Sequence, residues 1–322
     1  MSGTKSIIVA GLNYHDGIQH SEGARVSRYA WSGIDYHTVM RSMLRALADS
    51  VSELHPGIRT RCVVDTAPVL ERDFARLAGV GWFGKNTMLI SRKIGSWFFL
   101  GAVLTDVTLD YDQPFSADHC GTCTRCLDAC PTNAFPEPGV LDAGRCISYL
   151  TIEQRSRQIP EPLRRGMGTW LFGCDICQDV CPWNRFAPAA ESAAFSALDH
   201  LNPADCTRIL HLSDDEYRKT FGQTALARPG RAAMARNAAI VLGNLADTDS
   251  ESALCHALLD PAPIVRGAAA WALGQLDTKT ALMALRVHRQ SESDESVQQE
   301  IDAVLRNRSA SSAVRASDSD TI

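Results

Sequence analysis

The sequence lacks several features that would assign it to common classes of protein. It contains no run of about 18 apolar residues, so no segment is long enough to span a membrane as a helix. Residues Met1–Ser6 lead into the short apolar stretch Ile7–Leu12, which is too short and too poorly flanked for a secretory signal peptide. The net charge is −5, which argues against a uniformly basic nucleic-acid coat but permits a local basic face.

Two nucleotide-binding fingerprints are also missing. The glycine-rich turn Gly79–Asn86 contains Lys85, but no serine or threonine follows this lysine as a P-loop requires. The turn also fails as a dinucleotide fingerprint, because no clear strand–turn–helix unit surrounds it. Its flexible backbone and its lysine would still suit a phosphate or a large planar cofactor.

The composition is that of an ordinary globular protein. The chain has 322 residues, of which 45% are hydrophobic and 21% are charged, and this length favours two or three domains. Residues 1–113 alternate between strand and helix patterns, which predicts an α/β domain with a sheet covered by helices. The expected strands are Ser6–Leu12, Arg59–Asp65 and Trp97–Thr105, and the expected helices are Ile34–Leu54 and Val69–Ala78.

Three further segments follow the α/β domain. Residues 114–190 are dense in cysteine, proline and glycine, and residues 191–308 have helical patterns. Arg236–Leu245 resembles Arg266–Leu276 about 30 residues later, and Val297–Leu305 matches more weakly, which predicts a short HEAT-like stack of paired helices. An ordinary helical bundle is the alternative. The Ser-, Ala- and Asp-rich tail, residues 309–322, is predicted to be disordered.

Cysteine is abundant, and eight of the 11 cysteines fall into two linked runs. The first run has the full bacterial ferredoxin spacing, in which the fourth cysteine serves the other cluster. The second run lacks its leading cysteine, which Cys146 replaces. Two crossed [4Fe-4S] sites are therefore predicted: Cys120, Cys123, Cys126 and Cys181 on one cluster, and Cys130, Cys146, Cys174 and Cys177 on the other.

Zinc and disulfides are the alternatives for these cysteines. Structural zinc usually takes two paired knuckles separated by a loop, whereas three cysteines at successive x2 spacings suit an iron–sulfur cube. Eight clustered cysteines without a secretory signal indicate a reducing cytosol, so a cytoplasmic location is expected. The other three cysteines, Cys62, Cys206 and Cys255, fit small buried residues.

Asp65 is the leading candidate for acid–base chemistry. It ends a predicted strand, and ligands of open α/β sheets collect at such carboxyl ends. Burial beneath a cofactor would raise its pKa and let it donate a proton. Helix capping before Pro68 is the alternative role. His37, in an aromatic segment further upstream, fits a structural histidine.

These motifs together resemble the epoxyqueuosine reductase family. The resemblance runs from about Ser6 to Leu276 and includes both cysteine runs. Its other conspicuous segments are Leu12–Tyr14, Ser27–Tyr29, Asp35–His37, Val64–Arg72, Gly79–Asn86, Arg145–Glu153, Phe172–Gln178 and Cys181–Asn184. Members of this family are cobalamin-dependent iron–sulfur enzymes that complete queuosine in tRNA.

The resemblance implies a role for each part of the chain. Asp65 would be the proton donor, and electrons would pass through the two clusters to a cobalamin in the α/β domain. By position, the cofactor contacts would be Ser27, Asp65, Leu89, Leu100, Ser148 and Asp175. The substrate would be epoxyqueuosine in the tRNA anticodon stem-loop, gripped by the helical part and by basic residues near it. The chain would be monomeric, with a separate electron donor.

Members of this family usually carry about 65–75 further residues before the strand that here begins at Ser6, so the α/β domain is expected to be incomplete at its N-terminus. Other functions stay open. A dehalogenase-like cobalamin and iron–sulfur reductase would share the clusters, but it would not need the helical repeat and usually has an export signal. A ferredoxin-type electron carrier would not need the Asp65 motif, and a scaffold would use the clusters only structurally.

Overall fold

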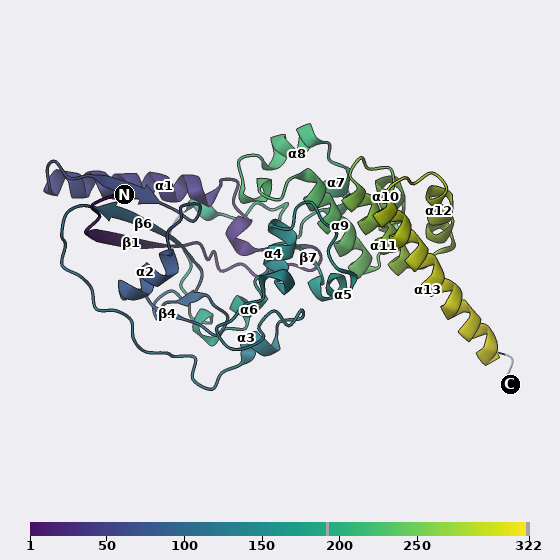
Figure 1. Cartoon of the computed structure of the whole chain (residues 1–322), viewed down its shortest axis with the longest axis horizontal. Coiled ribbons are helices and arrows are strands. Elements are labelled where there is room, and N and C mark those ends of the chain that lie inside the picture. Colours follow the sequence, from purple (N-terminus) through teal and green to yellow (C-terminus); the bar gives the residue numbers. More distant parts are fainter. Residues whose placement is uncertain (191–192, 320–322) are drawn as a thin grey trace.

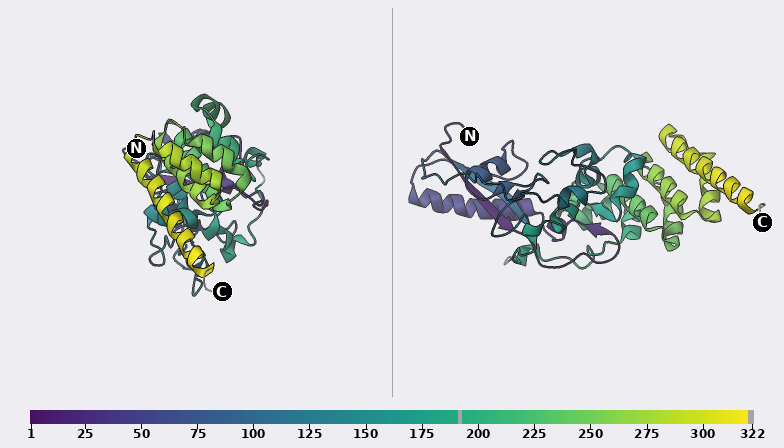
Figure 2. Two further views of the ribbon diagram at one scale, coloured as in Figure 1. Left: turned by 90° about the vertical axis from the view of Figure 1, so that its right-hand side faces the viewer. Right: turned by 90° about the horizontal axis from the view of Figure 1, so that it is seen from below.

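The structure is a computed structural model that describes residues 1–190 and 193–319. The molecule is elongated (Figures 1 and 2). The N-terminal sheet and its helices lie at one end and the C-terminal helices lie at the other. The cysteine-rich segment is between them, so it contacts both.

The N-terminal domain is built on three strands, β1 (Ser6–Asn13), β6 (Phe98–Thr105) and β3 (Thr60–Val63), in the order β1-β6-β3. β6 is antiparallel to both neighbours, so the carboxyl ends of β1 and β3 lie at the same edge of the sheet. From the carboxyl end of β3 at this edge, the chain continues to Asp65. All three strands were expected from the sequence.

One helix covers each face of the sheet. α1 (Tyr36–Leu54) begins after Asp35, whose side chain accepts a hydrogen bond from the His37 amide. Met40, Leu44 and Ala48, one helical turn apart, are buried on one face of the sheet, with Phe99 and Val103 of β6. The shorter α2 (Glu71–Leu77) contacts β1 and β6 and buries Ala75 with Phe98 on the other face.

The cysteine-rich segment contains short helices joined by turns. They are α3 (Arg125–Asp128), α4 (Ile147–Ile152), α5 (Glu161–Arg164) and α6 (Ile176–Asp179). Its strand β7 (Trp170–Phe172) pairs in parallel with β2 (Arg25–Val26), which ties this segment to the N-terminal domain. A small antiparallel hairpin, β4 (Trp82–Phe83) and β5 (Leu89–Ile90), carries the glycine-rich turn.

The C-terminal part is helical. Its elements are α7 (Cys206–His211), α8 (Asp214–Phe221), α9 (Arg231–Leu245), α10 (Glu251–Ala257), α11 (Pro263–Leu276), α12 (Lys279–Arg289) and α13 (Glu295–Ser319). α11 packs between α9 and α13. A Cβ added to Gly243 would lie 2.8 Å from the Cα of Ala272, and one added to Gly274 would lie 2.6 Å from Val304. The Leu-Gly pair common to the two repeats is therefore what lets neighbouring helices approach closely.

The C-terminal tail, which is predicted to be disordered, is helical over part of its length. α13 continues as a helix to Ser319, whereas the sequence analysis expects disorder from residue 309. Alanine and arginine in this stretch have high helix propensity and extend a helix whose first turns are packed. The last predicted residues, 320–322, lie outside the described residues.

Candidate functional site

The eight clustered cysteines come together in two groups. The pKa of the Cys126 thiol is raised by burial and, further, by its neighbours Cys181, Cys120 and Cys123. Cys181, 55 residues further along the chain, is therefore folded back onto the first run. Burial raises the pKa of the Cys181 thiol, and the nearby thiols of Cys120 and Cys123 raise it further.

The second group is formed in the same way. Cys146 lies beside Cys130, and Cys174 lies beside Cys177 and Cys146. Burial raises the pKa of the Cys174 and Cys177 thiols well above the ordinary value, and nearby cysteines raise it further. Cys177 also lies near Cys126, so the two groups approach each other at this point.

Backbone amides surround several of these sulfurs. The Ala134 amide donates to Cys130 Sγ at 3.3 Å, and backbone hydrogen bonds to Cys146, Cys174 and Cys181 lower their thiol pKa values against the effect of burial. Such hydrogen bonds stabilise thiolates that bind a metal cluster. Among the described residues, no three His, Cys, Asp or Glu side chains converge on one point as ligands of a single metal ion would. In a [4Fe-4S] cluster each cysteine binds a different iron, so that convergence is not required.

The glycine-rich turn braces the cysteine loops. Lys85 Nζ donates to the carbonyl oxygens of Gly121 at 2.7 Å and Cys123 at 3.0 Å. A Cβ added to Gly81 would lie 2.0 Å from the Ile90 carbonyl oxygen, so only glycine fits there. Two of the three donors of the ammonium group therefore hold the first cysteine loop, and the expected contact with a phosphate or a planar cofactor stays a prediction.

Asp65 lies two residues beyond β3, with a left-handed backbone (φ 38°) that costs energy in a non-glycine residue. Its carboxylate accepts hydrogen bonds from the Tyr36 hydroxyl at 2.8 Å and from His37 Nε2 at 3.2 Å. The capping alternative is wrong, because α2 begins only at Glu71 and has no side-chain cap.

The proton distribution at this site differs from the sequence prediction. His37 lies between two carboxylates, since its Nδ1 contacts Asp35 at 2.7 Å and its Nε2 contacts Asp65. These hydrogen bonds raise the pKa of His37 to about 9, and the bond from His37 lowers the pKa of Asp65 below its ordinary value. The raised pKa predicted for Asp65 refers to burial beneath a cofactor, and in the protein alone the pKa of this carboxyl is lowered instead. Its side chain is 58% exposed, so burial does not outweigh the imidazolium.

The sequence indicates a structural role for His37 and does not single out Tyr36. The Tyr36 ring stacks on Phe99 of β6, with ring centroids 4.2 Å apart and planes inclined by 1°. Phe99 therefore fixes the hydroxyl that holds Asp65. The signal available in the sequence was the Asp35-Tyr36-His37 tripeptide at the start of α1.

A cavity of about 500 Å³ opens beside this constellation. Tyr36 and His37 line it together with three arginines, Arg41, Arg155 and Arg228. Arg228 also contributes to the lowered pKa of Asp65 and forms an ion pair with Glu153 at 2.5 Å. The cavity thus lies beside a hydrogen-bonded histidine–aspartate pair and has positive charge in its walls.

The residues predicted to contact the cofactor differ in their burial and in their hydrogen-bond partners. The side chains of Ser27 and Asp175 are buried and hydrogen-bonded to each other, and Asp175 also accepts from Arg28 Nη1 at 3.2 Å. Leu89 is buried with Phe98 and Val80, and Leu100 packs at the edge of the same apolar cluster. Ser148, in α4, is half-buried.

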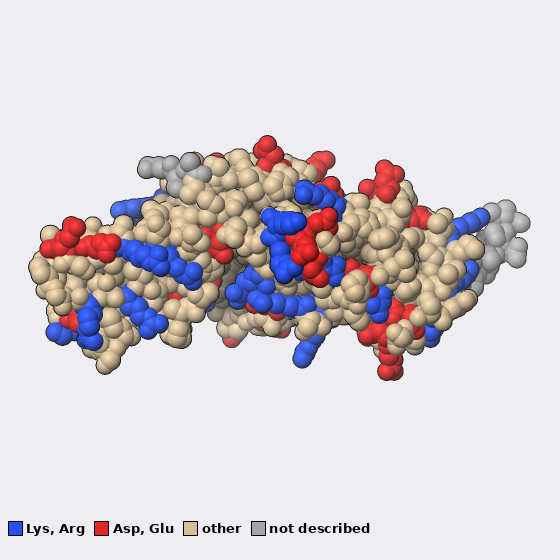
Figure 3. All heavy atoms as spheres, turned by 90° about the horizontal axis from the view of Figure 1, so that it is seen from above, with Lys and Arg blue, Asp and Glu red and all other residues tan. Residues whose placement is uncertain are grey.

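Basic residues near the helical part, which the resemblance assigns to tRNA binding, include several arginines that are not free to form a basic face. In the view of Figure 3, basic and acidic side chains lie next to each other in the middle of the molecule. Arg164 is buried in an ion pair with Glu300 at 2.8 Å, and Arg231 is paired with Asp260 at 2.7 Å. Arg236 is fully buried and donates to the Arg157 carbonyl at 2.7 Å and the Leu150 carbonyl at 2.9 Å. These three residues are structural.

The fold and the cysteine groups define a class of protein, an iron–sulfur oxidoreductase with an α/β domain, a double-cluster module and a helical repeat. A family model for the 4Fe-4S double cluster binding domain matches residues 119–184, and a HEAT-repeat model matches residues 224–306. A model described as epoxyqueuosine reductase matches residues 1–66.

Known proteins agree with this class. The epoxyqueuosine reductase of Synechocystis sp. is 45% identical over 239 residues, which are 73% of this chain and 82% of the relative. A crystal structure of epoxyqueuosine reductase with an epoxyqueuosine-modified tRNA stem-loop is 32% identical, with a TM-score of 0.87 over 95% of this chain and 82% of the other. A Bacillus subtilis epoxyqueuosine reductase, whose aspartate-bearing catalytic loop is swung out of its active site, is 31% identical, with a TM-score of 0.86 over 95% and 82%. The chain belongs to the epoxyqueuosine reductase family.

Proposed function

We propose that this protein reduces the epoxide of epoxyqueuosine at the wobble position of tRNA to give queuosine. The observation that carries the proposal is the position of Asp65. It lies at the sheet edge, hydrogen-bonded to a histidine that lines an arginine-rich cavity, in a chain that also has a double-cluster module. The family membership supplies the substrate class, and one relative was crystallised with the modified stem-loop.

The crossed ligation of the two clusters is part of this proposal. Cys126 and Cys181 share one group although 55 residues separate them, and Cys146 joins Cys130 and Cys174. Each group therefore draws one ligand from the other run, as in two-cluster ferredoxins. Electrons would cross between the groups where Cys126 and Cys177 approach each other. These thiols stay reduced in the cytoplasm, where we place the protein.

A cobalamin fits the α/β domain in part. Leu100 provides partly exposed apolar surface at one face of the sheet, Leu89 is buried behind it, and Ser148 provides a half-buried hydroxyl. Ser27 and Asp175 are occupied by each other and by Arg28, so they would hold the backbone around such a group rather than bind it through their side chains. When bound, the corrinoid would supply the low-valent cobalt that reduces the epoxide.

The role of the protein's own residues follows from the site geometry. Removing the epoxide oxygen as water takes two electrons and two protons, and it leaves a carbon–carbon double bond. Substrate covering Asp65 would exclude water, which raises the pKa of the carboxyl group. Asp65 would then take the proton that His37 Nε2 holds and deliver it to the leaving oxygen, while Asp35 stabilises the charge on His37 until transfer. The second proton would reach the departing hydroxide from solvent.

The arginines of the same cavity would bind the tRNA. Arg41, Arg155 and Arg228 line it beside Tyr36. Phosphate contacts of this kind give affinity without sequence information, and a base splayed out of the loop reaches the site.

Anaerobic reconstitution with iron, sulfide and cobalamin tests the proposal. The reconstituted protein should convert epoxyqueuosine-containing tRNA to queuosine-containing tRNA, as read by nucleoside mass spectrometry with a viologen reductant. Persistence of epoxyqueuosine, although both clusters and cobalamin are bound and reduced, would exclude this function.

A further inference from the structure

A second cavity lies beside the first cysteine group, and the proposed reaction does not use it. Its volume is about 910 Å³, and Cys181 forms part of its wall. None of the predicted cofactor contacts lines it, and it shares no lining residue with the cavity beside Asp65. The adjacent residues Arg28 and Tyr29 line one cavity each. A ligand here would therefore not occupy the proposed substrate site.

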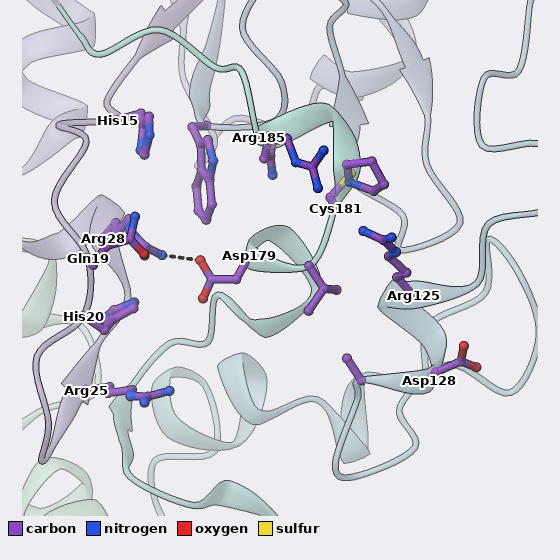
Figure 4. A pocket seen from close by; sticks show the side chains of 15 residues that line it. His15, Gln19, His20, Arg25, Arg28, Arg125, Asp128, Asp179, Cys181 and Arg185 are labelled. Carbon is purple, nitrogen blue, oxygen red and sulfur yellow. Dashed lines mark hydrogen bonds and ion pairs between the residues drawn. The ribbon is translucent and has the colours of Figure 1, made fainter.

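The walls of this cavity are rich in arginine. Figure 4 shows Arg25 and Arg28 along one wall, and Arg125 and Arg185 beside Cys181 on the opposite side. Arg28 is held by Asp179 at 2.6 Å, but within the described residues no ion pair is found for the other three arginines. Four arginines face two aspartates among the lining residues, so the cavity is positive within a chain whose net charge is −5.

Buried polar atoms without partners also gather here. His15 Nδ1, His20 Nδ1 and Arg25 Nε have no hydrogen-bond partner in the described part of the chain. The His20 side chain is only 5% exposed, and its other nitrogen contacts Asp175 at 3.1 Å. These atoms are shielded inside the walls, so a polar ligand in the cavity would meet the arginine guanidinium groups rather than these atoms.

Two exposed apolar residues are the sequence neighbours of lining residues, and we refer to them as the rim of the cavity. Phe186 is 81% exposed, and the Arg185 guanidinium lies over its ring, 5.8 Å from the centroid. Ile18, next to the lining residue Gln19, is 47% exposed. An exposed aromatic ring paired with arginine is typical of protein interfaces, whereas a small anion would make no use of it.

We propose that this cavity and its rim are the docking site of a small acidic electron-carrier protein that bears a flavin or an iron–sulfur group. Carboxylates of the carrier enter the arginine-lined cavity, and Phe186 packs against its surface. One electron then passes from the reduced carrier to the oxidised cluster next to Cys181, and no bond forms or breaks. Two such transfers supply the two electrons that each epoxide needs. The inference rests on the proposed function for this need of electrons.

A docking site for an acidic carrier on this acidic chain has to be a confined region of positive charge. An acidic carrier is repelled by most of this acidic chain, so attraction is confined to the positive cavity and orients the carrier there. Since the two cavities are separate, carrier and tRNA can bind at the same time.

The test uses cluster-loaded protein and, as the probe, an acidic flavodoxin in its reduced form. Stopped-flow absorbance follows cluster reduction, and calorimetry gives the affinity. The double variant Arg125→Glu/Arg185→Glu should lower the second-order rate constant about tenfold or more at low salt and flatten its salt dependence. Arg61→Glu/Arg286→Glu, two exposed arginines that line neither cavity, makes the same charge change as a control.

A second pair of variants separates packing from charge. Phe186→Ala should weaken flavodoxin binding about tenfold and leave the salt dependence unchanged, whereas Leu259→Ala, another exposed apolar residue, should have no effect. All variants should be reduced normally by methyl viologen radical, a small cation that needs no docking site, and should convert tRNA with it.

Two results would overturn the inference. In the first, the cavity variants and the control variants are reduced by flavodoxin at equal rates. In the second, inorganic phosphate binds the cavity while flavodoxin affinity is the same in every variant, which makes it a small-anion site. Viologen-driven conversion of tRNA is unaffected by either result, so it tests the proposed function separately.

Discussion

At the scale of single residues, the account depends on Asp65. Asp65→Asn should keep the clusters but lower the rate of queuosine formation about 100-fold or more, because the amide cannot deliver a proton. Nucleoside analysis under single-turnover conditions measures this rate. Glu71→Gln is the matched control, since Glu71 lies near Asp65 and burial raises its pKa. If Glu71→Gln lost the activity and Asp65→Asn kept it, the proton donor would be Glu71.

The charge state of His37 gives a second prediction. Its pKa is about 9 against an ordinary value of 6.5, because Asp35 and Asp65 stabilise the imidazolium. The stability that this pair contributes is therefore complete below pH 6.5 and is lost as the pH rises through about 9. On the acid side it is lost as Asp65 is protonated, below the ordinary carboxyl value of 3.8.

Nuclear magnetic resonance of histidine-labelled protein measures the His37 titration directly. The resonance should shift near pH 9 in the parent and at a lower pH in Asp65→Asn, which removes one of the two carboxylates. A His37 titration at the ordinary value in the parent would contradict the proposed proton store.

At the scale of structural elements, the link between α9 and the cysteine-rich segment is open to test. Arg236→Met leaves the carbonyl groups of Leu150 and Arg157 without their donor, which should cost roughly 3 kcal/mol. Thermal unfolding should shift downwards, and amide exchange should rise in residues 150–157. Arg218→Met, which breaks an exposed ion pair with Asp215, should cost less than about 1 kcal/mol. Equal effects of the two substitutions would contradict a structural role for Arg236.

The cluster ligands are also tested at this scale. Cys146→Ala should lose the cluster of the second group and keep most of the first, so iron content should fall to about half. The control is Cys255→Ala, which lies in α10 away from both groups and should keep the full iron content. A Cys146→Ala protein with both clusters intact would contradict the crossed ligation.

The sequence predicts the helices and strands of the N-terminal domain, but it does not predict the surroundings of individual side chains. The strands and helices of the N-terminal domain follow from local hydrophobic periodicity, and all five expected there are present. The pKa of Asp65 could not be predicted, since it is set by His37 and Tyr36, which lie 28 and 29 residues away in sequence. The burial of Arg236 could not be predicted for the same reason, since it depends on carbonyl groups about 80 residues upstream.

At the scale of the whole molecule, tRNA binding should depend on the cavity arginines. Arg155→Ala/Arg228→Ala should weaken binding and lower the slope of log K against log salt by about 1–2, because each arginine that neutralises a phosphate releases about one counterion. Filter binding across a salt series measures the slope. The remote pair Arg61→Ala/Arg286→Ala should leave it unchanged, and equal slopes for both double variants would place the RNA elsewhere.

The central claim is that electrons stored on the clusters end on the epoxide of the modified base. The direct measurement mixes reduced, cobalamin-loaded protein with epoxyqueuosine-containing tRNA, without further reductant, and follows the cluster absorbance. The account predicts that the clusters are reoxidised as queuosine forms, with two electrons consumed per epoxide, and that tRNA already containing queuosine causes no change. Clusters that stay reduced with the epoxide, or that are reoxidised equally by both tRNAs, would contradict it.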